Sequence, residues 1–182
     1  MSMPPKPGPR AGRLAQMLRV DHAGEYGAVA IYRGQRAVFD RLPHKAETAA
    51  LLKDMEDGEA HHLSTFDKLL TERKVRPTLL APLWNAAGFG LGAATALIGE
   101  KTAMACTAAV EDVIEKHYAE QISELGEDEP ELVATVRQFR DDELGHKHTA
   151  ETHGAESAPG YGLVSAAIRL GCRAAIKIAE KI

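Results

Sequence analysis

The sequence has little cysteine, few aromatic side chains and few residues that favour strands. Aromatic residues make up 5% of the chain, whereas Ala, Leu, Glu and Lys are plentiful, which favours a helical fold. The two cysteines, Cys106 and Cys172, lie in apolar stretches without a Cys-x-x-Cys motif. This argues against a structural zinc site or a redox dithiol. We therefore expect two buried thiols in a protein of a reducing compartment.

The chain also lacks a strong charge of either sign and an apolar run at its N-terminus. Its net charge of −4 argues against nucleic acid as a partner. Residues 1–13 are rich in proline and basic residues but lack the apolar core of a secretory signal. The 182 residues suffice for one domain with a substantial core. We predict a disordered leader over 1–13 and a single domain over 14–182.

No charged residue occurs between Pro77 and Gly99. A segment of that length can span a bilayer, but Pro82, Asn85 and four glycines make it less apolar than a typical spanning helix. A helix that packs closely through small residues, or that lies partly in a membrane interface, is the favoured interpretation. A transmembrane helix is the alternative.

Elsewhere, apolar residues recur at helical spacing and Pro or Gly separates the stretches. The pattern predicts further helices over 14–40, 45–73, 101–125, 131–153 and 161–181. Six helices with short connections favour an antiparallel bundle.

An internal duplication is the most informative pattern. Each copy has a Glu, a Tyr seven residues later and a Gln three residues further on. The copies are Glu25, Tyr32 and Gln35, and Glu111, Tyr118 and Gln121. Seven residues are two helical turns, so each Glu shares a helix face with its Tyr.

Each copy continues with a Glu-x-x-His motif at nearly the same distance, Glu59–His62 and Glu143–His146. Glu and His three residues apart lie side by side on a helix, so both can reach one metal site. A mixed oxygen and nitrogen set suits iron or manganese. One Glu from each of two helices, with Glu-x-x-His from each of the other two, is the ligand pattern of ferritin-like di-metal bundles.

We therefore predict an all-α, ferritin-like antiparallel four-helix bundle with two additional helices, internally duplicated. The predicted metal ligands, which are also the catalytic residues, are Glu25, Glu59, His62, Glu111, Glu143 and His146. The alternative is that these residues form solvated helix faces with surface salt bridges. The uncharged stretch 107–110 before Glu111 argues against it, because a lone carboxylate buried there would cost several kcal/mol without a cation.

Other polar residues are weaker candidates. Asp142 is placed to orient a ligating imidazole, because such rings usually donate their other N–H to an acceptor. Tyr32 and Tyr118 either line a substrate channel, hydrogen-bond to ligands or simply pack in the core. We expect the remaining histidines at the rim of the site (His117, His148), in supporting or surface positions (His22, His61) and at the surface or in turns (His44, His153).

Four runs of sequence resemble the demethoxyubiquinone hydroxylase family: 20–28, 103–111, 139–146 and 171–176. The resemblance covers roughly residues 13–182. It implies a membrane-associated monooxygenase that uses two iron ions and O2 to hydroxylate the ring of demethoxyubiquinol, a polyprenyl quinol. The choice of iron over manganese as the bound metal rests mainly on this resemblance. It further implies that one iron is bound by Glu25 and His62 and the other by Glu111 and His146, with Glu59 and Glu143 bridging the two.

The resemblance also bears on location. The chain lacks the transit peptide of mitochondrial members, which implies a bacterial protein bound peripherally to the cytoplasmic face of the inner membrane. The resemblance also implies partner proteins of ubiquinone biosynthesis. Two features suit a membrane: Trp84 and Phe89 as interfacial anchors, and a basic stripe on the last helix. The stripe consists of Arg169, Arg173, Lys177 and Lys181. A solvated face is the alternative.

Other classes fit less well. A ferritin-like ferroxidase would use the same six ligands, but the uncharged segment and the basic stripe suit a soluble iron store poorly. Rubrerythrin-like peroxidases usually carry a Cys-x-x-Cys iron domain, which this sequence lacks. A helical scaffold without catalytic activity would not need a duplicated ligand set.

Overall fold

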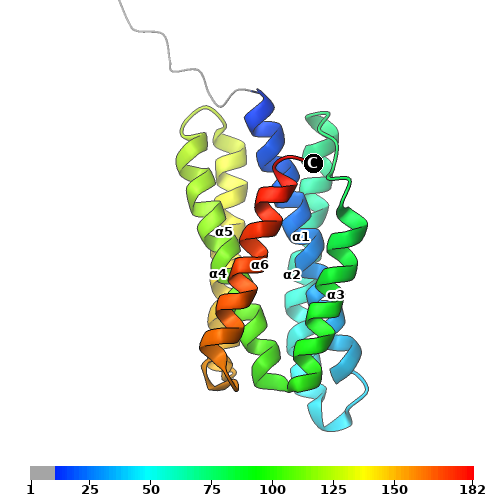
Figure 1. Ribbon diagram of the computed structural model, residues 1–182. Helices are drawn as coiled ribbons and strands as arrows, with labels where there is room; N and C mark the ends of the chain where they lie inside the picture. The colour runs from blue at the N-terminus through cyan, green and yellow to red at the C-terminus, as the bar shows by residue number, and fades with distance from the viewer. Residues whose placement is uncertain (1–10) are drawn as a thin grey trace, which may run out of the picture.

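The computed structural model describes residues 11–182, which form six α-helices and two short 3-10 helices and contain no strand (Figure 1). The elements are α1 (Ala11–Phe39), η1 (Pro43–Lys45), α2 (Ala46–Glu72), α3 (Ala81–Ile98), α4 (Glu100–Leu125), α5 (Pro130–Thr152), η2 (Ala155–Ser157) and α6 (Tyr161–Ala179). The predicted all-α fold is confirmed, and the packing of the bundle is consistent with a ferritin-like fold.

Proline and glycine set most of the helix boundaries. Pro82 and Pro130 lie in the first turns of α3 and α5, where a missing N–H costs nothing. Gly154 and Gly160 adopt positive φ angles of 88° and 66° in the connection before α6. The first helix begins at Ala11, so residues 11–13, which we expected in the leader, are helical. Residues 1–10 of the predicted leader lie outside the described part of the chain.

The two halves of the duplication form two helix pairs. Helix α1 packs on α2, and α4 packs on α5. The remaining helices cover one side of this four-helix core, because α3 packs on α1 and α6 packs on α4 (Figure 1). The four core helices therefore carry the predicted ligands, and α3 and α6 form an outer layer.

Helices α1 and α3 approach each other unusually closely through glycines. A Cβ at Gly92 would lie 2.0 Å from the carbonyl oxygen of Ile31, and one at Gly34 would lie 2.2 Å from that of Phe89. Within residues 11–182, α3 is the one helix long and apolar enough to cross a membrane, by length and composition alone. Its backbone nevertheless lies directly against α1, so the predicted close packing through small residues is confirmed.

This close packing predicts that one added methyl group between α1 and α3 lowers the stability of the protein. Gly92→Ala forces α3 away from α1, and we expect a loss of about 1–3 kcal/mol in the free energy of unfolding, as for other overpacked sites. Gly90→Ala is the matched control, because a Cβ there meets no atom within 4 Å. That variant should be as stable as the parent or slightly more stable. Chemical denaturation of both variants measures the difference, and equal stability would contradict the close approach.

Candidate metal centre

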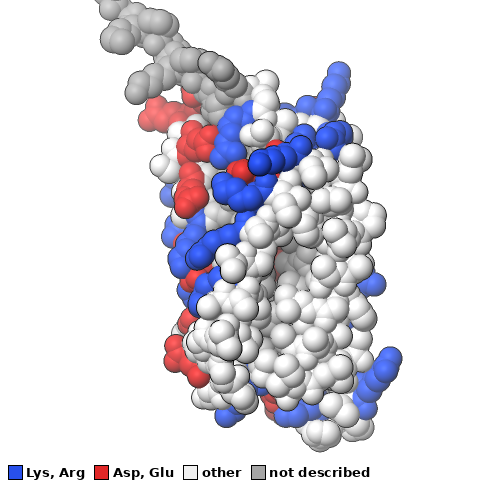
Figure 2. Space-filling model, in the orientation of Figure 1, with Lys and Arg blue, Asp and Glu red and all other residues white. Residues whose placement is uncertain are grey.

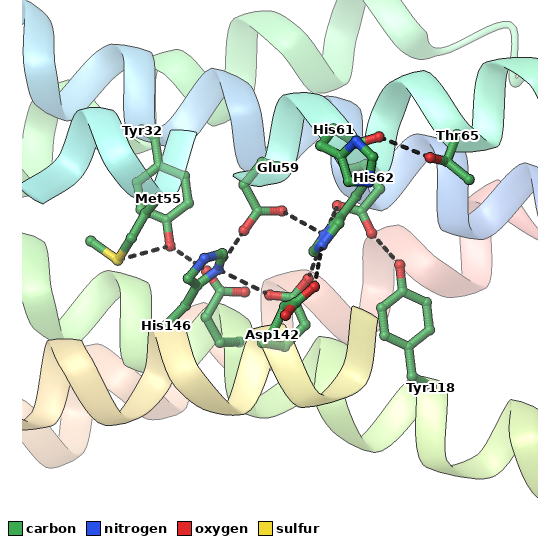
Figure 3. Close-up of polar contacts among 12 residues, drawn as sticks. Tyr32, Met55, Glu59, His61, His62, Thr65, Tyr118, Asp142 and His146 are labelled. Atoms are coloured by element: carbon green, nitrogen blue, oxygen red, sulfur yellow. Dashed lines mark hydrogen bonds and ion pairs between the residues drawn. The ribbon is translucent and has the colours of Figure 1, made fainter. Parts of the chain in front are cut away.

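The structure brings the six predicted ligand side chains together in the middle of the bundle (Figure 3). Helices α1 and α4 each contribute one glutamate, and α2 and α5 each contribute a Glu-x-x-His pair. Five of the six residues are at most 1% exposed, and the side chain of His146 is 16% exposed. The alternative of solvated helix faces is therefore wrong.

Two of the carboxylates each face both imidazoles. Glu59 places one oxygen 3.8 Å from Nδ1 of His62 and the other 2.8 Å from Nδ1 of His146. Glu143 does the same, at 3.2 Å and 3.6 Å. Glu25 lies 3.7 Å from Nδ1 of His62. Each imidazole thus directs Nδ1 into the cluster, between carboxylates that can bridge two cations.

The ligand atoms fall into two overlapping sets, and within each set all atoms lie within 4.8 Å of one another. Both sets contain Glu59 and Glu143; one adds Glu25 and His62, and the other adds Glu111 and His146. Such buried carboxylate and imidazole clusters can bind metal ions.

Several polar atoms of the cluster are buried without hydrogen-bond partners, which supports a bound metal ion. Both carboxylate oxygens of Glu59 and of Glu143, and Nδ1 of both histidines, are buried without a hydrogen-bond partner within the described chain. Burial and the neighbouring carboxylates raise the pKa of Glu59 and of Glu111 well above the usual range. Although burial lowers it, the nearby carboxylates of Glu143 and Glu25 raise the pKa of His62 to about 10. Four buried carboxylates with so few partners form a site that fits cations.

Two tyrosines connect the halves reciprocally. The hydroxyl of Tyr32, from the first copy, donates to Glu111 at 2.7 Å. The hydroxyl of Tyr118, from the second copy, donates to Glu25. Both rings are about 1% exposed. Of the alternatives that the sequence left open, hydrogen bonding to the candidate ligands therefore holds for both.

Asp142 contacts an imidazole, as the sequence indicated. Nε2 of His62 donates to its carboxylate at 3.1 Å, so Nδ1 of the ring is free to face the cluster. The same ring stacks on Phe139, with centroids 3.9 Å apart. This places the orientation of His62 under the control of two residues of α5.

The other histidines divide between buried and exposed positions. His22 is buried and pairs with Asp67 at 3.0 Å. His117 is partly buried, and its Nε2 donates to Asp21 at 3.1 Å. The remaining four are exposed: His44, His61, His148 and His153. His148 therefore differs from His117, although the sequence placed both at the rim.

Asp21 is a buried polar residue that we did not single out from the sequence. It accepts hydrogen bonds from His117 and, at 2.7 Å, from Gln121. Aligning the two copies could have drawn attention to this residue. Asp21 lies four residues before Glu25, at the position that Thr107 holds before Glu111. Gln35 correspondingly donates toward Thr107 at 3.4 Å.

An apolar pocket of about 450 Å³ lies between the outer layer and the core. Helices α1, α3, α4 and α6 line it almost entirely with Ala, Gly, Val, Leu and Ile. Trp84 also lines it, with its indole nitrogen buried, so this side chain packs inward, and its role as an interfacial anchor stays a prediction. Figure 2 shows the hollow in the uncharged face of the molecule.

A smaller cavity extends from this pocket toward the carboxylate cluster. The two share four lining residues: Val20, Gly24, Ile114 and Ile176. The smaller cavity is also lined by Glu25 and Tyr118. The apolar pocket therefore leads to the Glu25 side of the candidate metal centre.

The predicted basic stripe is only partly free. Arg169 donates to the buried Asp112 at 3.1 Å, and Lys116 and Lys147 contact the same carboxylate. Although burial raises it, hydrogen bonds from Lys116 and Lys147 lower the pKa of Asp112 to about 2. Arg169 therefore holds α6 against α4. The exposed basic residues of the stripe are Arg173, Lys177 and Lys181.

Comparison with known proteins agrees with this geometry. The family model described as "Ubiquinone biosynthesis protein COQ7" matches residues 12–179. The chain belongs to this family. It is 48% identical over 180 residues to the 3-demethoxyubiquinol 3-hydroxylase of Rhodospirillum rubrum, covering 99% of this chain and 83% of the relative.

Relatives in eukaryotes are similar over most of the chain. The mitochondrial NADPH-dependent 3-demethoxyubiquinone 3-hydroxylase of Mus musculus is 49% identical over 170 residues, covering 91% of this chain and 76% of the relative. The mitochondrial 5-demethoxyubiquinone hydroxylase of Saccharomyces cerevisiae is 43% identical over 189 residues, with coverages of 95% and 80%. The resemblance seen in the sequence is thus confirmed.

Proposed function

We propose that this protein is a 3-demethoxyubiquinol 3-hydroxylase, a di-iron monooxygenase of ubiquinone biosynthesis. The observation that carries the proposal is the buried cluster in which Glu59 and Glu143 each face both His62 and His146. The family supports the reaction, since a bacterial relative that this chain matches over 83% of its length bears this name.

In this proposal, Glu25 and His62 would hold one iron, Glu111 and His146 would hold the other, and Glu59 and Glu143 would be shared between them. The two overlapping sets of ligand atoms support this division. When bound, the iron pair supplies the activation of O2 and the transfer of one oxygen atom to the quinol ring. The chain's own residues hold the ligands in place: Tyr32 and Tyr118 fix the terminal carboxylates by hydrogen bonds across the halves.

The quinol ring is proposed to enter through the apolar pocket. Its volume of about 450 Å³ lies within the range typical of small-molecule sites. Its inner end reaches the cavity lined by Glu25 and Tyr118, which supports a position of the ring beside the metal centre. Side chains of low polarity exclude water there and surround the first part of a polyprenyl tail. The apolar lining is also the feature that an iron store would not require.

The outer layer is proposed to meet a membrane, where a polyprenyl quinol resides. Large apolar side chains of and beside α3 and α6 are exposed: Leu79, Leu83, Phe89, Leu97, Ile98, Leu163 and Leu170. Figure 2 shows an uncharged face around the hollow, with Lys and Arg gathered above it near the chain end of α6. An apolar face bordered by cations suits peripheral binding to the anionic cytoplasmic face of a bacterial inner membrane.

If the outer layer of α3 and α6 faces the membrane, the protein should bind vesicles of anionic lipid, and salt should weaken this binding. The triple variant Arg173→Gln, Lys177→Gln, Lys181→Gln should bind vesicles of anionic lipid about a hundredfold more weakly, at about 1 kcal/mol per cation. Neutralisation of the exposed Lys53, Lys68 and Lys74 on or just after α2 is the control and should leave binding unchanged. Flotation of vesicles measures both variants. Equal losses in the two triple variants would exclude this face as the membrane contact.

Turnover tests the proposed function directly. Iron-loaded protein is given a short-tailed demethoxyquinol and O2, with and without NADPH, which the name of the mouse relative specifies. We expect hydroxylated quinol that carries one atom of ¹⁸O from ¹⁸O2, detected by mass spectrometry. Oxidation of Fe²⁺ without oxygen in the ring would instead identify a ferroxidase.

A further inference from the structure

The two halves of the candidate metal centre differ in how their histidines are supported. The duplication aligns Glu59 with Glu143 and His62 with His146. In this alignment Asp142, which directly precedes Glu143, corresponds to Gly58. The residue four positions before each glutamate also differs, with Met55 in the first copy and Phe139 in the second. Asp142 and Phe139 contact His62 of the other copy, and Gly58 faces His146, so these differences act on the centre.

The His62 side is enclosed. Nε2 of His62 donates to Asp142 at 3.1 Å, and the ring stacks on Phe139 at 3.9 Å between centroids. The whole residue is 1% exposed. A carboxylate on the far nitrogen fixes the tautomer and the orientation of a ligating ring and raises its basicity. His62 is therefore held in the geometry in which Nδ1 faces a cation.

The His146 side is open. A Cβ at Gly58 would lie 3.3 Å from both Nε2 and Cε1 of His146, so Gly58 faces this ring where Asp142 faces the other. Glycine offers no acceptor, and Nε2 of His146 hydrogen-bonds to no residue between 11 and 182. The nearest described aromatic ring, that of Tyr32, is 6.3 Å away at 73°. The side chain is 16% exposed, against 2% for His62.

We propose that the two metal positions are inequivalent, and that the ion held by Glu111 and His146 exchanges with solvent much faster than the ion held by Glu25 and His62. This inference rests on the proposed di-metal centre. Gly58 and Asp142 are positioning residues: neither is a ligand, and each acts through the imidazole that it faces. Partners of this kind typically change metal affinity about 10–100-fold, so the two rates of loss should differ by at least about tenfold.

The test is the rate of metal loss, which needs no turnover. Full-length protein is loaded with Fe²⁺ without oxygen, mixed with excess ferrous chelator, and followed by the absorbance of the chelate. We expect two ions per chain, released in two phases of one ion each. A single phase that releases both ions would overturn the inequivalence while leaving the di-metal centre intact. Binding of fewer than two ions would instead overturn the proposed centre.

Two variants assign the phases to the residues. Asp142→Asn should accelerate the slow phase about tenfold or more and leave the fast phase unchanged. Asp141→Asn is its control, because Asp141 is an exposed neighbour of equal charge. Gly58→Asp gives His146 the acceptor that His62 has, and should slow the fast phase. Gly58→Ala, which covers the ring without an acceptor, is its control.

The variants also keep the proposal falsifiable if one of them folds poorly, because each acts on a different phase. Circular dichroism shows which variants retain the helical content of the parent. Acceleration of the fast phase by Asp142→Asn, or an unchanged fast phase in folded Gly58→Asp, would overturn the assignment.

Discussion

Glu143→Ala is expected to abolish metal binding while the bundle remains helical. Glu143 is fully buried and faces both imidazoles, at 3.2 Å and 3.6 Å, so its loss weakens both metal positions. Turnover should fall more than about a hundredfold, because the loss of a residue that only orients a ligand already costs up to that much. Removal of one of four crowded carboxylates also relieves repulsion in the metal-free protein, so the fold should persist.

The measurement combines metal analysis with circular dichroism. Glu131→Ala, an exposed position on the same helix, should retain both metal and activity. His62→Ala should lose metal as Glu143→Ala does. Full metal occupancy in both folded ligand variants would contradict the ligand assignment.

Gly27→Leu is expected to abolish turnover by a different route, with the metal retained. Gly27 lines the apolar pocket, and a Cβ there meets no atom within 4 Å. A leucine side chain would therefore occupy the space proposed for the quinol. Displacement of a substrate by even about 1 Å can cost about 10²-fold, so kcat/KM should fall by at least that factor.

The stability of this variant should not be the cause of the loss. A glycine within a helix is less favourable than leucine, so the substitution favours the helix itself. Gly90→Leu on α3, where a Cβ also meets open space, is the matched control and should retain turnover. Normal turnover in Gly27→Leu would remove the pocket from the proposed substrate path.

Local sequence signals predicted the fold well because most of the boundaries depend on local chemistry. Pro82, Pro130 and Gly160 end or begin helices through their own backbone preferences, and the structure places helix ends beside them. The N-terminal boundary was less accurate, since α1 begins at Ala11 although the leader was expected to extend to residue 13. Nothing at that position in the sequence marks a helix start.

The six candidate ligands could be found from the sequence because each motif repeats at matched spacing on one helix face. Contacts between helices had no such signal. The pairing of Arg169 with Asp112 depends on how α6 lies on α4, and the inward direction of Trp84 depends on how α3 lies on α1. For the same reason, His117 and His148 looked alike in sequence although only His117 meets a buried carboxylate.

Mössbauer spectroscopy of ⁵⁷Fe-loaded protein, together with metal analysis, shows whether the four glutamates and two histidines hold a pair of iron ions. We expect two iron ions per chain and, after oxidation, a diamagnetic signal from two antiferromagnetically coupled ferric ions. One uncoupled iron per chain, or none in folded protein, would contradict this expectation.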